Sequence, residues 1–168
     1  MKMQKRQDGF SLIELLIVVA IIGIIAAIAI PNLLASRRAA NEGSAQSSLR
    51  TIHSSQATYQ ATAGNGNFGN MVQLGPQALG GQGLIDAVLS SNSKSGYTFV
   101  VTPVAAVAGV SAATFSAVCK PTVPSGVSQT GTRKFGVTED GVMHGQTDTL
   151  GTQLTAAELL STGNVLGN

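Results

Sequence analysis

The stretch GFSLIELLIVVAIIGIIAAIAIP, from Gly9 to Pro31, decides the fold of this chain. Between its glycine and its proline, Ser11 and Glu14 are the only polar residues. Apolar residues fall on every side of a helix with this sequence, so no single face is marked for packing inside a soluble protein. The run is also long enough to cross a hydrocarbon core, which needs about 20 residues at 1.5 Å each. We therefore predict a membrane-spanning helix over residues 10–31.

A secretory signal is the main alternative, and length argues against it. Lys2, Lys5 and Arg6 would form its basic head, and residues 27–29 (AIA) resemble a small-residue cleavage site. However, the apolar region of a signal peptide has only about 7–15 residues. The orientation of the span is less certain, because two arginines follow it at residues 37–38 and the positive-inside bias favours a cytoplasmic N-terminus only slightly.

The composition of the whole chain excludes several classes of function. The 168 residues fit one domain with an appended element, and only 11% of them are charged, against about 25% in a typical protein. The net charge of +2 is contributed by the first nine residues, so the remainder is formally neutral. This distribution offers neither the basic surface of a nucleic-acid-binding protein nor an acidic tract. The single cysteine, Cys119, cannot form an internal disulfide and is expected to be a small buried hydrophobe.

Glu14 is the exception within the apolar run. An ionisable side chain in a membrane helix is costly and by default marks a functional site with a partner. A local interpretation is that a carboxylate near a helix start gains from the helix dipole and from unpaired N–H groups. The other interpretation is that it meets the terminal amine of a second copy of the chain. Such a pair at 4 Å attracts by about 4 kcal/mol at an effective dielectric constant near 20, which would set the register between identical subunits.

The segment KRQDGFSLIELLIVVAIIGIIAAIAIPNLLASRRAANE resembles the start of a type IV prepilin or pseudopilin. In both, a short basic leader ends in glycine, phenylalanine follows, and a glutamate comes four residues later. The resemblance implies that a prepilin peptidase of the inner membrane removes residues 1–9 by cutting between Gly9 and Phe10, and then methylates the Phe10 amine. It also implies a cytoplasmic leader, and roles in subunit assembly for Phe10 and Glu14.

The resemblance further matches Gly23 and Pro31 to positions that weaken the helix in that family. Glycine costs about 1 kcal/mol relative to alanine in a helix interior, and proline removes a backbone hydrogen bond. Residues 23–31 are thus predicted to form a stretchable segment in an assembled filament. Alternatively, Gly23 merely permits close helix packing and Pro31 merely marks the membrane exit.

The helix is predicted to continue over residues 32–63 as an amphipathic rod. Ala45, Leu49, Ile52 and Tyr59 recur at helical spacing, with Gln56 as one polar interruption, so this stripe needs a surface to cover it. Residues 64–96 are glycine-rich and predict a loop with a short turn at 71–74 and a short helix at 83–91.

Residues 97–147 predict an antiparallel sheet of three to four strands that covers this stripe. The strand candidates are Tyr97–Val104, Ala113–Val123 and a hairpin over Thr132–Thr147 turning at Asp140-Gly141. The stretches KSGYTF and GTRKFGVTEDGV also resemble, more loosely, strands of type IV pilin-like proteins. Residues 148–168 form a C-terminal tail, in which TAAELLS is compatible with one or two helical turns. The expected fold is therefore α+β and pilin-like, with the hydrophobic half of a long helix protruding and its second half packed on the sheet.

The polar residues give no constellation for catalysis. His53 and His144 fall on different predicted elements, and no base lies at an interpretable spacing from a nucleophile. Neither an enzyme activity nor a cofactor nor a small-molecule substrate is expected. Glu139, Asp140 and Asp148 offer oxygen ligands of the kind that calcium prefers, and some pseudopilins use calcium, but a solvated turn is the simpler interpretation. Many type IVa pilins close a C-terminal loop with two cysteines, which this chain cannot do.

The expected function is that of a structural subunit of a type IV pilus filament serving adhesion, twitching motility or DNA uptake. The expected partners are identical subunits in a helical homopolymer, the prepilin peptidase, membrane lipid before assembly, and an inner-membrane platform with its ATPase. The precursor would be a single-pass inner-membrane protein that ends in an extracellular pilus. A pseudopilin of a type II secretion system, in a periplasmic pseudopilus, is the alternative. A monomeric binding module tethered by its helix is a third possibility, which leaves Glu14 without a purpose.

Overall fold

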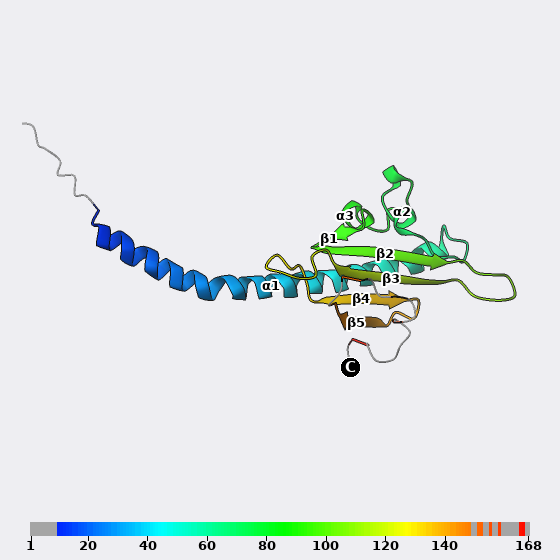
Figure 1. Cartoon of the computed structure of the whole chain (residues 1–168). Helices are drawn as coiled ribbons and strands as arrows, with labels where there is room; N and C mark the ends of the chain where they lie inside the picture. Colours follow the sequence, from blue (N-terminus) through cyan, green and yellow to red (C-terminus); the bar gives the residue numbers. More distant parts are fainter. Residues whose placement is uncertain (1–9, 149–150, 153–154, 156–157, 159–164, 167–168) are drawn as a thin grey trace, which may run out of the picture. The chain divides into compact units, whose positions relative to one another are not determined.

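The computed structural model of the chain describes residues 10–148, 151–152, 155, 158 and 165–166 (Figure 1). The chain divides into two compact units, Met1–Ser36 and Arg37–Asn168, and the first helix contributes to both. The helical elements are α1 (Leu12–Ala61), α2 (Met71–Leu74), the 3-10 turn η1 (Gln77–Leu79) and α3 (Ala87–Ser90). The strands are β1 (Ser93–Lys94), β2 (Tyr97–Val104), β3 (Thr114–Pro121), β4 (Arg133–Thr138) and β5 (Met143–Thr147).

The first unit contains the amino-terminal half of α1. The helix begins two residues after the predicted start at Phe10, and its first backbone hydrogen bond runs from the Leu15 N–H to the Ser11 carbonyl at 3.2 Å. The helix continues through Pro31, whose missing N–H leaves it without one backbone bond. Beside the proline, the Asn32 side-chain amide donates to the Ile28 carbonyl at 3.0 Å.

The second unit is built on a five-stranded antiparallel sheet in the order β1-β2-β3-β4-β5 (Figure 1). Each strand pairs with its neighbour in sequence, with Phe99 opposite Cys119 and Cys119 opposite Phe135. Because every connection is a hairpin, successive loops lie at alternate ends of the sheet.

One face of the sheet and the second half of α1 enclose the core. Side chains alternate between the two faces of a strand, so β2, β3 and β4 each send every second residue inward. The inward-facing core residues of these strands are Tyr97, Phe99, Phe115, Ala117, Cys119, Phe135 and Val137. They meet the helical stripe of Ala45, Leu49, Ile52 and Tyr59, all buried, which confirms the predicted amphipathic rod.

Polar contacts fix the same part of α1 to the loop between β3 and β4. Arg38 donates to the Gln129 side-chain oxygen at 3.0 Å, and the Asn41 amide donates to the Thr130 carbonyl at 2.9 Å. One helical turn after Arg38, Glu42 accepts hydrogen bonds from the main-chain N–H and the hydroxyl of Thr132, at 2.7 and 2.8 Å. These contacts hold the loop, which is rich in glycine and serine, against the helix.

The sheet has more strands than the predicted three to four. The additional strand, β1, has two residues and pairs with Tyr97 and Thr98 through a tight turn. In this turn Ser95 and Gly96 have positive φ angles of 51° and 72°. A strand this short contains too few residues to show a period-two pattern, so it could not be predicted from the sequence.

The helix predicted over residues 83–91 is reduced to the four residues of α3. Gly83 has a φ of 71°, and the main-chain N–H groups of Leu84 and Ile85 donate to the Leu74 carbonyl instead of starting a helix. The helix begins only after Asp86, whose carboxylate caps it by accepting from the Leu89 N–H at 2.7 Å. The turn predicted at Met71–Leu74 is confirmed as α2.

The hairpin predicted over residues 132–147 is confirmed as β4 and β5. The Gly141 N–H donates to the Thr138 carbonyl at 3.1 Å, and Gly141 has a φ of 76°. The connection spans Glu139–Val142 and is therefore longer than the two-residue Asp140-Gly141 turn that was predicted.

Described residues of the C-terminal tail contact the far edge of the sheet. Val165 forms an antiparallel bridge with His144, and the Leu166 N–H donates to the Met143 carbonyl at 2.7 Å. Thr155 and Glu158 exchange the reciprocal hydrogen bonds of a helix N-terminus, at 2.7 and 3.2 Å. The remainder of the helical turns predicted for TAAELLS lies outside the described residues.

Candidate subunit-assembly segment

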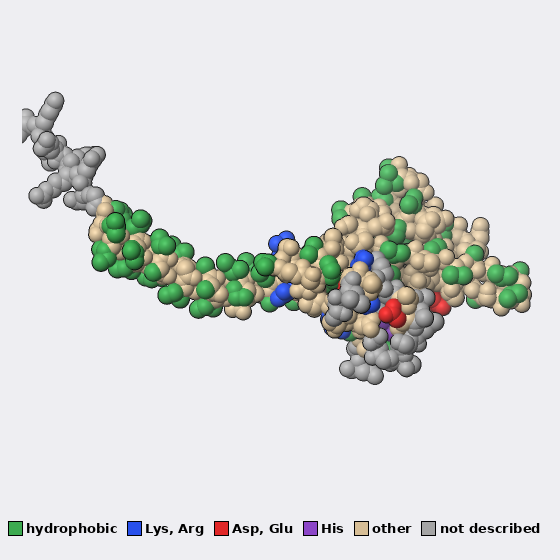
Figure 2. All heavy atoms as spheres, in the orientation of Figure 1, with side chains coloured by type: hydrophobic (Ala, Val, Ile, Leu, Met, Phe, Trp, Pro, Cys, Tyr) green, Lys and Arg blue, Asp and Glu red, His purple; other side chains and the backbone are tan. Residues whose placement is uncertain are grey.

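The segment from Phe10 to Leu33 presents an almost continuous apolar surface. In the described part of the chain, α1 is the one helix long and apolar enough to cross a bilayer, and none of its most apolar window is buried by the rest of the protein. Figure 2 shows hydrophobic side chains along this stretch of the helix. The exposed fraction is 82% at Phe10 and 69% at Leu33. A surface of this kind must be covered by lipid or by protein.

The carboxylate of Glu14 lies in the first turn of this helix and has a partner within its own chain. The Ser11 main-chain N–H donates to Glu14 Oε2 at 3.0 Å. Ser11 precedes the first helical residue, so Glu14 occupies the third position of the helix, from which an acidic side chain can reach back to the capping residue. The local interpretation of Glu14 is thus realised in the isolated chain, and only one of the two carboxylate oxygens takes part in this bond.

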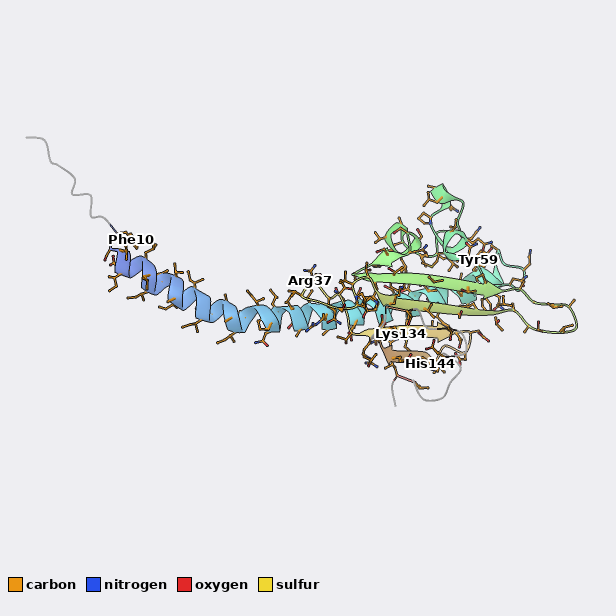
Figure 3. The ribbon with its side chains drawn as sticks, in the orientation of Figure 1. Phe10, Arg37, Tyr59, Lys134 and His144 are labelled. Carbon is orange, nitrogen blue, oxygen red and sulfur yellow. The ribbon has the colours of Figure 1, made fainter. Side chains whose placement is uncertain are left out.

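Ser11 is a contributor to the site that the sequence interpretation did not single out. The signal was present, because a serine three residues before a glutamate at the start of an apolar run is the pattern of a capping box. Phe10, by contrast, lies next to this cap with its side chain exposed (Figure 3). Gly9, on the other side of the predicted cut, lies outside the described residues.

Gly23 leaves an open position on the surface of the helix. A Cβ atom built at Gly23 has no other atom within 4 Å, so its absence is not required by any contact within this chain. The helix also stays continuous across Pro31. The single chain does not decide between a stretchable segment and the alternative of close helix packing at Gly23 with a membrane exit at Pro31, so the stretchable segment stays a prediction.

The polar residues considered for chemistry are not brought together. His53 on α1 packs against Phe115, with ring centroids 6.0 Å apart, whereas His144 is buried on β5. Glu139 and Asp140 precede β5, and Asp148 follows it at the opposite end of that strand. Among the described residues, no group of three or more histidine, cysteine or acidic side chains is placed to hold a metal ion.

Two buried titratable groups serve the core and not a reaction. Burial raises the pKa of the Cys119 thiol, so the reactive thiolate is disfavoured. Burial likewise raises the pKa of Tyr97, whose hydroxyl donates to the Arg133 carbonyl at 2.8 Å. Lys134 and His144, labelled in Figure 3, lie on β4 and β5.

Comparisons with known proteins find the same amino-terminal segment. The family model described as the prokaryotic N-terminal methylation motif matches residues 4–30. The type IV major pilin protein PilA of Myxococcus xanthus is 38% identical over 73 residues, which cover 43% of this chain and 33% of that protein. The type IV wide pilus major component PilA4 of Thermus thermophilus is 54% identical over 56 residues, covering 33% of this chain and 43% of that protein.

Secretion proteins share this segment as well. The type II secretion system core protein G of Dickeya chrysanthemi is 33% identical over 58 residues, covering 34% of this chain and 38% of that protein. The chain therefore spans less than half the length of these curated relatives. No solved structure matches the chain. Through its amino-terminal segment, the chain is similar to type IV pilins and to type II secretion proteins, and this segment carries the N-terminal methylation motif.

Proposed function

We propose that this chain is a structural subunit of a type IV pilus filament. The observation that carries the proposal is the exposed apolar helix over residues 12–33 with a single carboxylate, Glu14, in its first turn. A tether needs the apolar surface alone, whereas a polymer of identical helices also needs a polar contact to fix their register. The similarity to two pilus components over this segment supports the same conclusion.

We infer that the subunit starts as an inner-membrane precursor with its leader in the cytoplasm. In this proposal the prepilin peptidase cuts between Gly9 and Phe10 and methylates the new amine, and the match to the N-terminal methylation motif supports such processing. Removal of the leader places a positive charge four residues before Glu14. An incoming subunit then offers its carboxylate to the amine of a subunit already at the filament base.

The Ser11–Glu14 hydrogen bond would stabilise the Glu14 carboxylate while the precursor is in the membrane. A carboxylate without partners in hydrocarbon would be strongly disfavoured, and the cap supplies one charge-assisted bond before assembly. The second oxygen stays available for the amine of a neighbouring copy. During assembly the apolar helices exchange lipid for one another, so little burial is lost. An ATP-driven platform in the inner membrane supplies the work of extraction in this proposal.

A pseudopilin of a type II secretion system is the second candidate function. It is favoured by the similarity to the type II secretion system core protein G over the same segment. The two functions share processing, the membrane precursor and the helical polymer, and they differ in the length and location of the filament.

Shearing of intact cells tests the proposed function directly. A pilus subunit is expected in the sheared fraction as long fibres, and mass spectrometry of those fibres should find N-methylated Phe10 as the first residue. A mature chain that begins elsewhere would contradict the processing step. A chain absent from sheared fibres but required for release of secreted proteins would favour the pseudopilin, and a chain that stays monomeric in the membrane would support the tethered module.

A further inference from the structure

The loop between β2 and β3 ends in an exposed apolar tip. Residues 105–113 read AAVAGVSAA and contain no charged side chain. Val107 and Val110 are 54% and 81% exposed, and Figure 2 shows hydrophobic side chains gathered at this end of the second unit. Hairpin tips usually carry glycine, asparagine, aspartate or proline, so the valines have no local role in making the turn. Residues 104–113 are called the apolar tip below.

The apolar tip is held in one conformation. Val107 and Ser111 exchange two main-chain hydrogen bonds of 3.0 Å each, and the Val110 N–H donates to the Val107 carbonyl at 3.0 Å. The Ala106 N–H also donates to the Asn67 side-chain oxygen at 2.9 Å, which ties the tip to the loop after α1. A surface that is already ordered loses little conformational entropy when it binds.

Acidic side chains accompany the apolar tip at its end of the sheet. The β4–β5 loop lies at this end because the hairpin connections alternate, and it carries the exposed residues Glu139 and Asp140. No lysine or arginine occurs in the sequence between Arg50 and Lys94, or between Lys94 and Lys120. The part of α1 after Arg50, α2 and the apolar tip therefore contain no lysine or arginine.

The opposite end of the sheet carries arginines and an exposed valine, and is thus complementary in charge to the end with Glu139 and Asp140. The loop between β3 and β4, residues 122–132, is uncharged and presents Val127 at 83% exposure. Arg38 donates a hydrogen bond to Gln129 of this loop, and Arg37 is the residue before Arg38 on α1 (Figure 3). This end is called the basic end below. Two acidic residues also lie at this end and take part in hydrogen bonds there: Glu42 accepts two from Thr132, and Asp148 accepts one from the Gly151 N–H.

These two surfaces fit each other but cannot meet within one chain. They lie at opposite ends of the same sheet, so only a second copy can bring them into contact. A contact between two different surfaces of identical molecules does not close on itself unless the rotation forms a ring, and it otherwise propagates as an open helical polymer. Such a stack places valine against valine and carboxylate near guanidinium, without juxtaposing like charges.

We propose that the apolar tip of one subunit binds the basic end of a second copy of this chain, with Val107 and Val110 against Val127 and with Glu139 facing Arg37. This inference rests on the proposed filament function and adds to it a head-to-tail contact between the second units. The contact is separate from the pairing of Glu14 with the terminal amine.

Chemical cross-linking of filaments tests this contact. The full chain carrying both Val110→Cys and Val127→Cys is expressed in cells that assemble filaments, and the sheared fibres are treated with a short bismaleimide. The double variant is expected to give a ladder of covalent multimers, about tenfold or more above either single variant. The matched control pairs Val127→Cys with Val72→Cys, an exposed valine on α2. The wild-type chain controls for Cys119, which is buried.

The outcomes separate the contact from the proposed function. Absence of wild-type fibres contradicts the filament itself. Fibres in which the double variant gives no more product than the α2 control overturn the head-to-tail contact and leave the filament intact. Equal dimers from the Val110→Cys variant alone indicate a symmetric contact and overturn the proposal, as does cross-linking of the tip only to a different protein.

Charge reversal gives a second, independent measurement. Glu139→Lys and Arg37→Glu are each expected to lower the amount of sheared fibre by about fivefold or more, because each brings like charges together. The combined variant restores the opposite pair and is expected to recover most of the yield. Fibre amounts that are not recovered by the combined change would contradict the pairing.

Discussion

The side chain of Gln56 and the main chain of Gly69 form a reciprocal pair of hydrogen bonds in the core. The Gln56 amide nitrogen donates to the Gly69 carbonyl at 2.6 Å, and the Gly69 N–H donates to the Gln56 side-chain oxygen at 2.9 Å. Gln56 is fully buried. The one polar residue in the apolar stripe of α1 is therefore the anchor of the glycine-rich loop that follows the helix.

Replacing Gln56 with leucine is expected to destabilise the second unit by about 2–4 kcal/mol. Leucine fills a similar volume but leaves the N–H and the carbonyl of Gly69 buried without partners, and each such group costs about 1–3 kcal/mol. Chemical denaturation of the detergent-solubilised chain would measure the change. Gln60→Leu is the matched control, because Gln60 bonds the Gly66 carbonyl at an exposed position and is expected to cost less than about 1 kcal/mol. Equal effects of the two changes would contradict the anchor.

Replacing Glu14 with glutamine separates the two roles of this side chain. Glutamine can still accept the Ser11 hydrogen bond at the helix start, but it brings no charge to a neighbouring amine. We expect Glu14→Gln to lower the number of fibres by about tenfold or more, nearly as much as Glu14→Ala, while the precursor still accumulates in the membrane. Electron microscopy of cells and immunoblots of membrane fractions provide the two measurements.

The control for this prediction is Ser11→Ala, which keeps the main-chain N–H and should leave fibre number close to wild type. Normal fibres from the Glu14→Gln variant would show that capping, and not charge pairing, is what assembly requires.

Two glycines are expected to respond to alanine in opposite directions. A Cβ atom at Gly131 would lie 2.7 Å from Tyr97 Cζ, and Tyr97 is fully buried with its hydroxyl bonded to Arg133. Gly131→Ala should therefore destabilise the second unit by about 1–3 kcal/mol through overpacking. Gly43 is exposed on α1 with no atom within 4 Å of such a Cβ, so Gly43→Ala should stabilise the chain by about 0.5–1 kcal/mol. Midpoints of thermal unfolding that shift in the same direction would contradict this assignment.

Asp86 is expected to make a small contribution to stability that disappears in acid. Lys94 Nζ lies 2.8 Å from the carboxylate, and this bond, aided by the Leu89 N–H, lowers the pKa of Asp86. Because this pKa is lower in the folded chain than in the unfolded chain, the ionised carboxylate stabilises the fold at every pH above the unfolded pKa, which is near 4. The stabilisation is lost as the pH falls through the pKa of the folded chain.

Asp86→Asn keeps an acceptor for the Leu89 N–H but removes the ion pair. We expect it to be less stable than wild type by less than about 1 kcal/mol at pH 7, because the pair is exposed, and equally stable near pH 2. Denaturation curves at pH 7, 4 and 2 would measure this convergence. A difference that persists unchanged at pH 2 would show that the ion pair is not its cause.

The elements with long, regular patterns were predictable from the sequence. Uniform apolarity predicted the first half of α1, and helical spacing of Ala45, Leu49 and Ile52 predicted which face of the second half is buried. Runs rich in β-branched and aromatic residues, together with the turn at Asp140-Gly141, predicted the sheet. In the site, the cost of a charge in an apolar helix identified Glu14.

Features that depend on one or two residues were not predictable in the same way. The strand β1 is created by the turn at Ser95 and Gly96, and α3 is shortened because Leu84 and Ile85 bond to Leu74. These outcomes are decided by competing hydrogen bonds from distant segments. The local interpretation of Glu14 predicted a gain from unpaired N–H groups at the helix start, but it did not identify Ser11 as the donor.

The bridge between His144 and Val165 has a consequence for the proposed filament, in which many copies would be crowded together. A sheet ends in strands whose outer rims can recruit a strand from another molecule and grow into insoluble ribbons. Here one rim is a strand of only two residues, and the other is partly occupied by Val165 and Leu166. Pairing of edge strands between neighbouring molecules is therefore disfavoured, and each molecule keeps its own fold at high local concentration.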